Sequence, residues 1–302
     1  MESAKKLKLL FVINPKSGRG KDDPQNLIHT FFQDKPYDLH FFNLHTARKK
    51  GLSLQQVVRD LQPDGVVAVG GDGTVRSVAT VLIGTDIPLG ILPAGSANGM
   101  ARELSLPLTM PEALEVIVKR ITQKIDVVRV DKDQYCVHLG DIGLNALMVK
   151  YFERSGIRGQ IGYARVALKA LYHQQLLDIS IDNGTEKLER QAFMVVFGNA
   201  RQYGTGAFIN PDGDLSDGIF EVVLIKKISV LELLKMLFRH RPFDPAKTEI
   251  ISARQVSIHT KKKRTSSWMA NTWAKYIPSM PTSFTGSSLS LAARVKPYKC
   301  MG

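Results

Sequence analysis

The segment GGDGT (Gly70–Thr74) holds the residues of this sequence whose types and spacing best suit phosphate chemistry, and it directly follows the apolar run Val66–Val69. Its glycines let a phosphate approach the backbone, and Thr74 is expected to cap the helix that follows. A carboxylate beside a phosphate is repelled unless a cation or a proton lies between them. Asp72 therefore predicts either metal binding or removal of a proton from an attacking hydroxyl. The structural alternative is a tight turn in which Asp72 only caps a helix.

Two further segments offer glycines, hydroxyls and cations where phosphates could lie. NPKSGRG (Asn14–Gly20) follows the first apolar run, and LPAGSANGMAR (Leu92–Arg102) follows the fourth. Lys16 and Arg19 are equally well explained as solvated surface charges. None of these segments is the P-loop G-x-x-x-x-G-K-[ST], so phosphate binding by that device is excluded. Three such loops at successive strand ends predict one shared ligand site.

The elements that must position these loops alternate between strands and helices. Strands are expected at Leu7–Ile13, Leu39–Leu44 and Val66–Val69, and another within IPLGILP. Helices are expected at 23–32, at 74–83, after the third loop, and where Leu54, Val57, Val58 and Leu61 recur at helical spacing. This alternation predicts a mostly parallel sheet covered by helices on both faces.

Near residue 124 the pattern changes to hairpins, one with Asn-Gly at its turn, and helices are expected only near 145–175 and 228–238. The fold class is therefore α/β: a three-layer nucleotide-binding domain at 1–123 and a second, β-rich domain at 124–263. The remaining residues, 264–302, contain no Asp or Glu and no clear periodicity, so regular strands are not expected there.

Composition agrees with a globular protein of 302 residues, 44% hydrophobic and with a formal net charge of +13. Cys136 and Cys300 are too few for a disulfide framework and too far apart for a metal-ligand pair. No apolar stretch is long enough to span a bilayer, which predicts a cytoplasmic protein without a transmembrane segment. The charge suits an anionic partner, but charge alone does not support nucleic-acid binding.

The order NPKSGRG, GGDGT, PAGSANGMAR resembles the diacylglycerol kinase catalytic family, which includes bacterial lipid kinases and sphingosine kinase relatives. The resemblance continues through LGDIGLNA (Leu139–Ala146), GNARQYGTGAFINP (Gly198–Pro211) and LSDGIFEVVLI (Leu215–Ile225). It implies transfer of the γ-phosphoryl group of ATP to a lipid hydroxyl with Mg²⁺.

Residue roles follow from the same resemblance. Asp72 is the central acidic, catalytic residue. Asp217, and less directly Asp214, match an acidic position that helps to hold Mg²⁺, and Asp126 matches a further acidic position near the site. Without the resemblance, each of these three carboxylates is as well explained as a turn or surface residue. The expected nucleotide-binding residues are Asn14, Pro15, Lys16, Ser17, Gly18, Thr46, Gly70, Gly71, Asp72, Gly73, Thr74 and Ser96.

The departures from the family pattern are mild in two places and serious in one. Gly95–Gly99 reads GSANG where the family often has GTGND, and Asn145 stands where Asp is usual. The family's carboxyl-terminal Asp-Gly-Glu motif, whose glutamate is the candidate general base, is missing.

The codons of Trp268–Lys275 suggest where that motif went. In the given frame these codons must read TGG ATG GCN AAY ACN TGG GCN AAR. Read from the third base of the first codon, the same nucleotides begin GAT GGC NAA. The first two triplets encode Asp and Gly, and the third encodes Glu for one identity of the undetermined base N. The lysine run Lys261–Lys263 just upstream is a site where one nucleotide is easily lost. We therefore interpret 264–302 as an aberrant tail translated out of frame. The alternative is a divergent basic tail that binds membranes through Trp268 and Trp273.

The sequence thus predicts an ATP- and Mg²⁺-dependent lipid kinase of phospholipid metabolism, acting on diacylglycerol or a similar lipid during peripheral contact with a membrane. A homodimer is compatible with it. Two alternatives remain: a non-catalytic nucleotide- or lipid-binding protein, which the missing glutamate favours, and an NAD-kinase-like small-molecule kinase.

Overall fold

The computed structural model describes residues 6–15, 23–130, 134–143, 176–203, 207–227, 244–261, 288–292 and 298–301. The chain divides into two compact units. Unit 1 comprises residues 1–127, 204–206 and 296–302, and unit 2 comprises 128–203 and 207–295. The helices expected near 145–175 and 228–238 lie outside the described residues, as do Lys16, Ser17, Gly18 and the codon-derived segment Trp268–Lys275.

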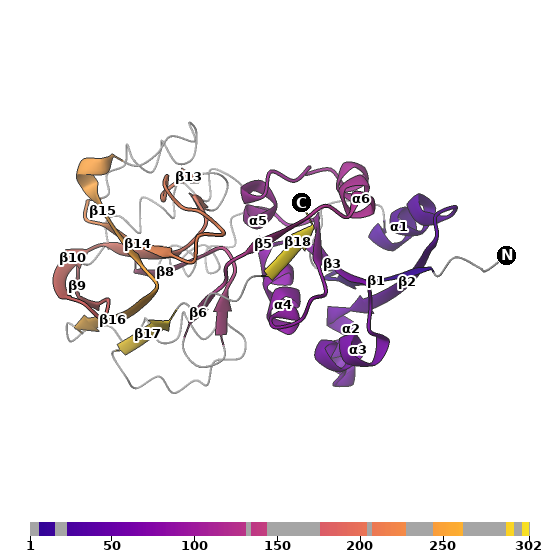
Figure 1. Ribbon diagram of the computed structural model, residues 1–302, viewed down its shortest axis with the longest axis horizontal. Helices are drawn as coiled ribbons and strands as arrows, with labels where there is room; N and C mark the ends of the chain where they lie inside the picture. Colours follow the sequence, from indigo (N-terminus) through magenta and orange to yellow (C-terminus); the bar gives the residue numbers. More distant parts are fainter. Residues whose placement is uncertain are drawn as a thin grey trace, which may run out of the picture. The chain divides into compact units, whose positions relative to one another are not determined.

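Unit 1 is built on a six-stranded sheet of order β2-β1-β3-β4-β18-β5 (Figure 1). All neighbours are parallel except β18 and β5, which are antiparallel. The strands are β1 (Leu7–Ile13), β2 (Tyr37–Asn43), β3 (Gly65–Gly70), β4 (Leu89–Pro93), β5 (Thr122–Ile125) and β18 (Tyr298–Met301). β1, β3 and β4 lie in the middle of the sheet and read as apolar runs because helices cover both of their faces.

Helices cover the two faces of this sheet (Figure 1). Alternate residues of β1 and β3 pack with α1 and α6 in one core cluster, while α4 packs on β3, β4 and β1 and is itself contacted by α3. The helices are α1 (Pro24–Phe32), α2 (Leu44–Lys50), α3 (Leu54–Leu61), α4 (Asp72–Leu82), α5 (Gly99–Glu103) and α6 (Met110–Lys119). The predicted three-layer α/β architecture is confirmed.

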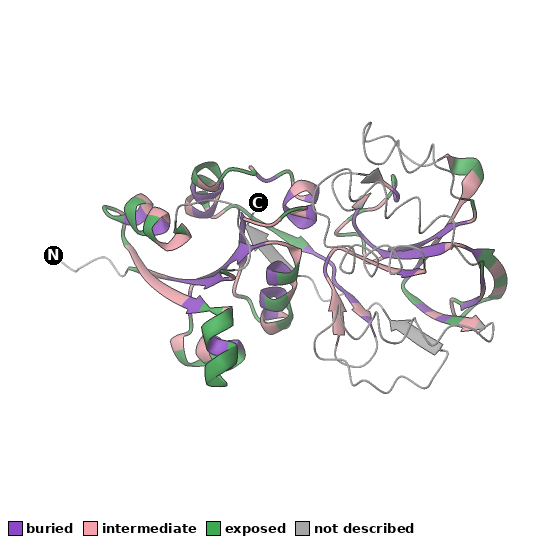
Figure 2. Ribbon diagram, turned by 180° about the vertical axis from the view of Figure 1, so that it is seen from behind, coloured by how far each residue is buried: buried purple, intermediate pink, exposed green. Residues whose placement is uncertain are grey.

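Unit 2 is β-rich, as predicted, and all its strand pairings are antiparallel. One sheet has the order β10-β9-β16-β17-β6-β7, another the order β15-β14-β11-β8, and β12 pairs with β13. The inward residues of the two larger sheets form one core, and β11 and β14 are buried along their whole length (Figure 2). The elements are β6 (Val128–Val130), β7 (Gln134–Cys136), β8 (Leu139–Gly143), β9 (Leu177–Asp182), β10 (Lys187–Ala192), β11 (Met194–Gly198), β12 (Gln202–Tyr203), β13 (Ala207–Phe208), β14 (Phe220–Ile225), the 3₁₀ turn η1 (Pro245–Lys247), β15 (Thr248–Ala253), β16 (Gln255–Lys261) and β17 (Ser288–Ala292).

The Asn-Gly hairpin of unit 2 forms where the sequence predicts it. Asn183 Oδ1 accepts hydrogen bonds from the backbone N–H groups of Thr185 (3.0 Å) and Glu186 (2.9 Å), and Gly184 takes φ +87°. Only a residue without a Cβ adopts that angle freely, so the dipeptide fixes the turn between β9 and β10.

An ion-pair cluster joins the two larger sheets of unit 2. Glu249 on β15 pairs with Arg190 on β10 (2.8 Å) and with Lys226 (2.5 Å). Burial alone would raise the pKa of Glu249, but the hydrogen bonds and charges of Lys226 and Arg190 outweigh it and hold the pKa below its usual range. This carboxylate therefore stabilises the unit in its ionised form.

The tail supplies two strands, which corrects the expectation that 264–302 forms none. β17 joins β16 to β6 in unit 2, and β18 joins β4 to β5 in unit 1. The physical reason is local for β17, because Ser288–Ala292 alternates serine and leucine.

Candidate nucleotide-binding site

The loops of unit 1 that carry the predicted site begin at the carboxyl ends of neighbouring parallel strands. β1 is followed by Asn14, β3 by Gly71 and β4 by Ala94, and the strands pair in the order β1-β3-β4. Parallel strands bring these ends to one edge of the sheet, which is where ligands bind in open α/β sheets. The predicted juxtaposition of the three loops is thus present for their described residues.

Asn14 and Thr74 connect the first loop to the second. The Asn14 backbone N–H donates to the Val69 carbonyl (3.2 Å), and its side-chain Nδ2 lies 3.4 Å from Thr74 Oγ1. Thr74 is 2% exposed, and its hydroxyl fills the space that a Cβ on Gly70 would need. Thr74 is therefore a buried packing residue in the first turn of α4, and the expectation that it caps this helix is wrong. The N-cap is Gly71, which has no side chain to accept a bond.

The second and third loops touch through their backbones. A Cβ on Gly95 would lie 2.4 Å from the Gly71 Cα, a separation that real Cβ atoms do not adopt. Asp72 adds a polar link, since its Oδ1 accepts a hydrogen bond from the Met100 N–H (3.0 Å) in the first turn of α5. Asp72 therefore does cap a helix, namely the neighbouring α5 rather than α4. A two-oxygen carboxylate keeps further acceptor capacity beyond that bond.

Asn98 holds the third loop in a closed shape. Its Oδ1 accepts from the Gly95 N–H (2.8 Å), and its Nδ2 donates to the Gly95 carbonyl (3.0 Å). Its backbone lies in the left-handed region at φ +51°, which asparagine tolerates better than most residues. The sequence analysis did not single out Asn98, although an Asn before a glycine in a loop is a recognisable turn signal.

Gly73 is the glycine that the protein's own packing does not explain. It is exposed in the first turn of α4, and within the described residues a Cβ placed on it would meet no atom within 4 Å outside its own stretch of helix. Glycine in a helix costs up to about 1 kcal/mol relative to alanine. Open space beside the backbone at a helix amino terminus is what an incoming anion requires.

Pro15, Ser96 and Thr46, the other predicted nucleotide residues that the structure describes, lie around this edge. Pro15 and Ser96 are exposed in the first and third loops. Thr46 is exposed in the first turn of α2, and its N–H donates to the cap residue Asn43 (3.0 Å). Since β2 pairs in parallel with β1, the start of α2 lies at the same edge of the sheet. Asp126, at the end of unit 1, is 4% exposed, so it is a buried rather than a surface carboxylate.

The predicted metal residues belong to unit 2, in the turn before β14. Asp214 and Asp217 are both exposed, and each accepts a hydrogen bond from a backbone N–H two residues on, those of Ser216 (2.8 Å) and Ile219 (2.9 Å). The bonds from the Ser216 side chain and backbone lower the pKa of Asp214. Two exposed carboxylates in one turn suit Mg²⁺ chemically. Among the residues that the structure describes, however, no three His, Cys, Asp or Glu side chains are grouped to hold a metal.

Glu221 is an acidic residue of this region that the sequence analysis missed. It is 5% exposed on β14, and its Oε2 accepts a hydrogen bond from Asn210 Nδ2 (2.6 Å). Burial raises the pKa of Glu221, and the negative charges of Asp217 and Asp212 raise it further, against the lowering effect of the Asn210 bond. Its position in the apolar strand Phe220–Ile225 was the available signal, because an acid inside such a strand is rarely solvated.

Comparisons with known proteins identify the class that this fold and these loops define. Residues 8–130 match the family model described as "Diacylglycerol kinase catalytic domain", and residues 141–286 match "YegS C-terminal NAD kinase beta sandwich-like domain". Residues 8–130 therefore match the diacylglycerol kinase catalytic domain and residues 141–286 a YegS-type carboxyl-terminal domain, which agrees with the resemblance found in the sequence.

Individual relatives agree with this assignment. A diacylglycerol kinase of Mycobacterium tuberculosis is 34% identical over 180 residues, 57% of this chain and 58% of that protein. A probable YegS-like lipid kinase of Pectobacterium atrosepticum is 27% identical over 229 residues, 74% of this chain and 75% of that protein. This chain thus spans less than two thirds of the length of the M. tuberculosis relative.

A solved structure supports the fold. A putative diacylglycerol kinase from Bacillus anthracis str. Sterne has a TM-score of 0.67 at 20% identity, covering 99% of this chain and 98% of that one. At this identity the likeness concerns architecture alone.

Proposed function

We propose that this protein is an ATP- and Mg²⁺-dependent lipid kinase that phosphorylates diacylglycerol or a similar lipid alcohol. The observation that carries the proposal is the loop cluster of unit 1, where Asn14 contacts Thr74, Asp72 contacts Met100, and Gly73 leaves open space at a helix amino terminus within the described residues. In the proposed reaction the lipid hydroxyl oxygen bonds to the γ-phosphorus of ATP, the bond to the ADP oxygen breaks, and the hydroxyl proton passes to a base.

The lipid class is supported by what the relatives are called. The M. tuberculosis protein is named a diacylglycerol kinase and the P. atrosepticum protein a probable lipid kinase. Among the described residues, no helix combines the length and the apolar character needed to cross a membrane. A kinase of this kind would reach its substrate by peripheral contact with a bilayer.

We assign the nucleotide to Asn14, the first loop and Gly70–Thr74, with Thr46 and Ser96 at the rim. Asp72 is the proposed acidic residue at the phosphates. Mg²⁺, when bound, would neutralise phosphate charge, and the carboxylates proposed to serve it are Asp217 and Asp214, with Asp126 a further acidic residue near the site.

No residue of the given chain is assigned as the general base. No Asp or Glu follows Glu249, and the Asp-Gly-Glu motif emerges only from the alternative frame across Trp268–Lys275. We propose that the intact gene product carries that glutamate and that the present chain is impaired. Loss of a general base typically costs about a hundred- to ten-thousand-fold in rate. A chain that binds ATP without turning over any lipid would instead be a nucleotide- or lipid-binding protein.

The test combines sequencing of the gene with two assays. The chain as given and a chain with the frame restored after Lys263 are each assayed for phosphate transfer from radiolabelled ATP to a mixed lipid extract in detergent micelles. ATP affinity is measured separately by calorimetry. We expect similar ATP affinity for both chains and much faster transfer by the restored one.

The informative variant is Asp72→Asn, made in the chain with the frame restored after Lys263, where transfer is expected to be measurable. An asparagine Oδ1 can still accept the Met100 N–H, so the cap on α5 is kept while the charge is removed. We expect unchanged thermal stability and loss of transfer. Full activity in Asp72→Asn would contradict the role proposed for Asp72, and transfer to NAD or a sugar but not to lipid would contradict the substrate class.

A further inference from the structure

The turn between α2 and α3 presents a group of exposed cations next to an exposed leucine. Arg48, Lys49 and Lys50 form the last turn of α2, and all three are exposed. Leu52 follows Gly51 and is 55% exposed, one of three exposed large apolar side chains in the described part of unit 1. We call these four residues the basic tip.

The backbone keeps the basic tip at the end of the helix. Asn43 caps the start of α2 by accepting from the N–H groups of His45 and Thr46, both at 3.0 Å. Gly51 ends the helix in the left-handed conformation at φ +67°, and its own N–H bonds to the Ala47 carbonyl. Ala47 is the only residue of α2 that is buried. The helix thus rests on the sheet through a narrow strip and turns its cationic end toward solvent.

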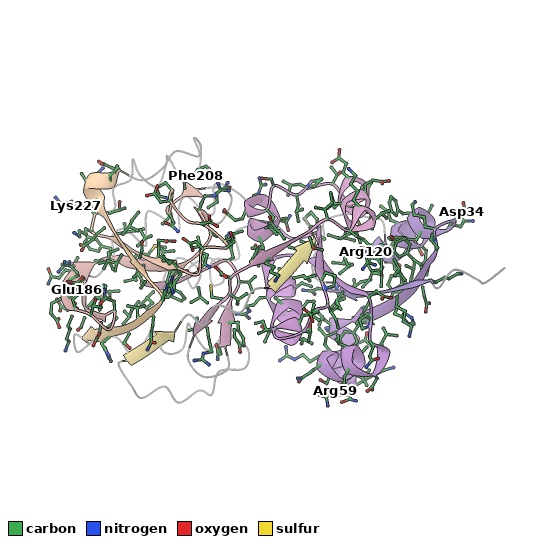
Figure 3. All side chains as sticks on the ribbon, viewed as in Figure 1. Asp34, Arg59, Arg120, Glu186, Phe208 and Lys227 are labelled. Atoms are coloured by element: carbon green, nitrogen blue, oxygen red, sulfur yellow. The ribbon has the colours of Figure 1, made fainter. Side chains whose placement is uncertain are left out.

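The cations of the basic tip have no counter-charge within the described structure. None of the three forms an ion pair with a described residue. The sequence between Asp38 and Asp60 contains no acid, and the next helix adds Arg59, which points away from the sheet (Figure 3). A solvent-exposed helix usually alternates charges of opposite sign, whereas the basic tip carries only positive charges.

We propose that the basic tip is the surface through which unit 1 docks on an anionic bilayer. Three cations beside one exposed leucine suit a lipid surface, since headgroup phosphates attract the cations and the leucine enters the interface. The inference rests on the proposed function, which requires contact with a membrane-embedded alcohol. A nucleic acid would match the charge but leave Leu52 without a role.

The position of the basic tip agrees with this use. Thr46 lies in the first turn of the same helix, at the sheet edge where the three loops meet, and Lys50 lies four residues further, about 6 Å along the helix axis. A bilayer bound by the basic tip would therefore lie near the proposed nucleotide loops, which belong to the same unit.

The expected size of the effect follows from three charges near an anionic surface. Together they should raise the partition coefficient on anionic vesicles by roughly 100-fold at physiological salt. The gain should shrink in high salt, where the Debye length falls to about 3 Å at 1 M. Leu52 should add roughly fivefold by entering the interface.

The experiment measures binding without requiring turnover. Co-sedimentation with phosphatidylglycerol–phosphatidylcholine vesicles, and with phosphatidylcholine alone, compares the full chain with Arg48→Ala/Lys49→Ala/Lys50→Ala and with Leu52→Ala. The matched control, Lys6→Ala/Lys119→Ala/Lys124→Ala, removes the same charge from exposed positions elsewhere in unit 1. Thermal unfolding confirms that each variant folds.

We expect the basic-tip variant to lose roughly 100-fold in binding to the anionic vesicles and the control variant to stay within a few-fold of the unchanged chain. Equal losses in both triple variants, or wild-type binding that does not depend on anionic lipid, would overturn the assignment. Phosphorylation of a detergent-dispersed lipid by the frame-restored chain, with and without the basic-tip substitutions, reports on the proposed function separately. This assay needs no bilayer, so we expect it to be unaffected by the substitutions.

Discussion

A substitution at Gly73 tests the stability of the fold and the affinity for nucleotide separately. Replacing Gly73 by alanine adds a methyl group in the first turn of α4, where no described atom outside its own stretch of helix lies within 4 Å. The substitution should therefore raise the free energy of unfolding by up to about 1 kcal/mol, because alanine is the better helix former. If nucleotide phosphate occupies that space, the methyl group should weaken binding by about 1–3 kcal/mol, or roughly 5- to 150-fold.

The measurement is a pair of titrations, denaturant unfolding for stability and calorimetry with a non-hydrolysable ATP analogue for affinity. Thr80→Ala is the control, since Thr80 is exposed on the same helix two turns further on and gains helix propensity without approaching the loops. The expected pattern is a stabilised Gly73→Ala protein with weakened binding and a Thr80→Ala protein with normal binding. Unchanged affinity in Gly73→Ala would show that the nucleotide does not use this space, and the reasoning from the open glycine would fail.

Three further substitutions give distinct signatures. Glu221→Gln should stabilise the protein near pH 7. Because the pKa of Glu221 is raised in the folded state, the wild type loses stability as pH rises from about 4.5 through that pKa. In denaturant titrations below about pH 4.5, the stability advantage of the variant should vanish. Glu249→Gln should cost about 1 kcal/mol at pH 7, discounted for partial exposure, and this cost should disappear as pH falls below the ordinary value of 4.5, because the lowered pKa makes the stabilisation a property of the ionised form. Asn98→Ala should lower the free energy of unfolding by about 1–3 kcal/mol and weaken ATP binding. The substitution removes both hydrogen bonds that close the third loop, and alanine is less suited than asparagine to a positive φ.

The central strands of unit 1 were predictable because each carries a strong local signal. The expected strand Leu7–Ile13 coincides with β1, and the expected helix at 74–83 overlaps α4. The apolar runs are buried on both faces, which makes composition alone sufficient. Shorter elements were predicted less accurately. The strand expected to reach Leu44 ends at Asn43, because Asn43 caps α2. Neither α2 nor α6 was predicted.

The sequence predicts members of the site but not the contacts between them. Glycine-rich loops after successive strands indicate a phosphate site, yet the hydrogen bond from Met100 to Asp72 joins residues 28 positions apart, and no local pattern encodes it. The same holds for Glu221, whose burial and raised pKa depend on neighbours brought together by strand pairing. Thr74 shows the opposite failure, since a threonine near a helix start favours a cap by propensity but is buried here as packing.

The strands β17 and β18 bear on the reading-frame hypothesis less than their location suggests. Sheet pairing uses the backbone N–H and C=O groups that every residue except proline carries, so a strand beside β4 and β5 can form from either frame. A general base, in contrast, is a side chain, and the acid-free sequence after Glu249 cannot supply one from this region. The tail can therefore complete the sheet of unit 1 and still lack the chemistry, which is why activity in the restored frame, rather than the presence of these strands, decides between the two interpretations.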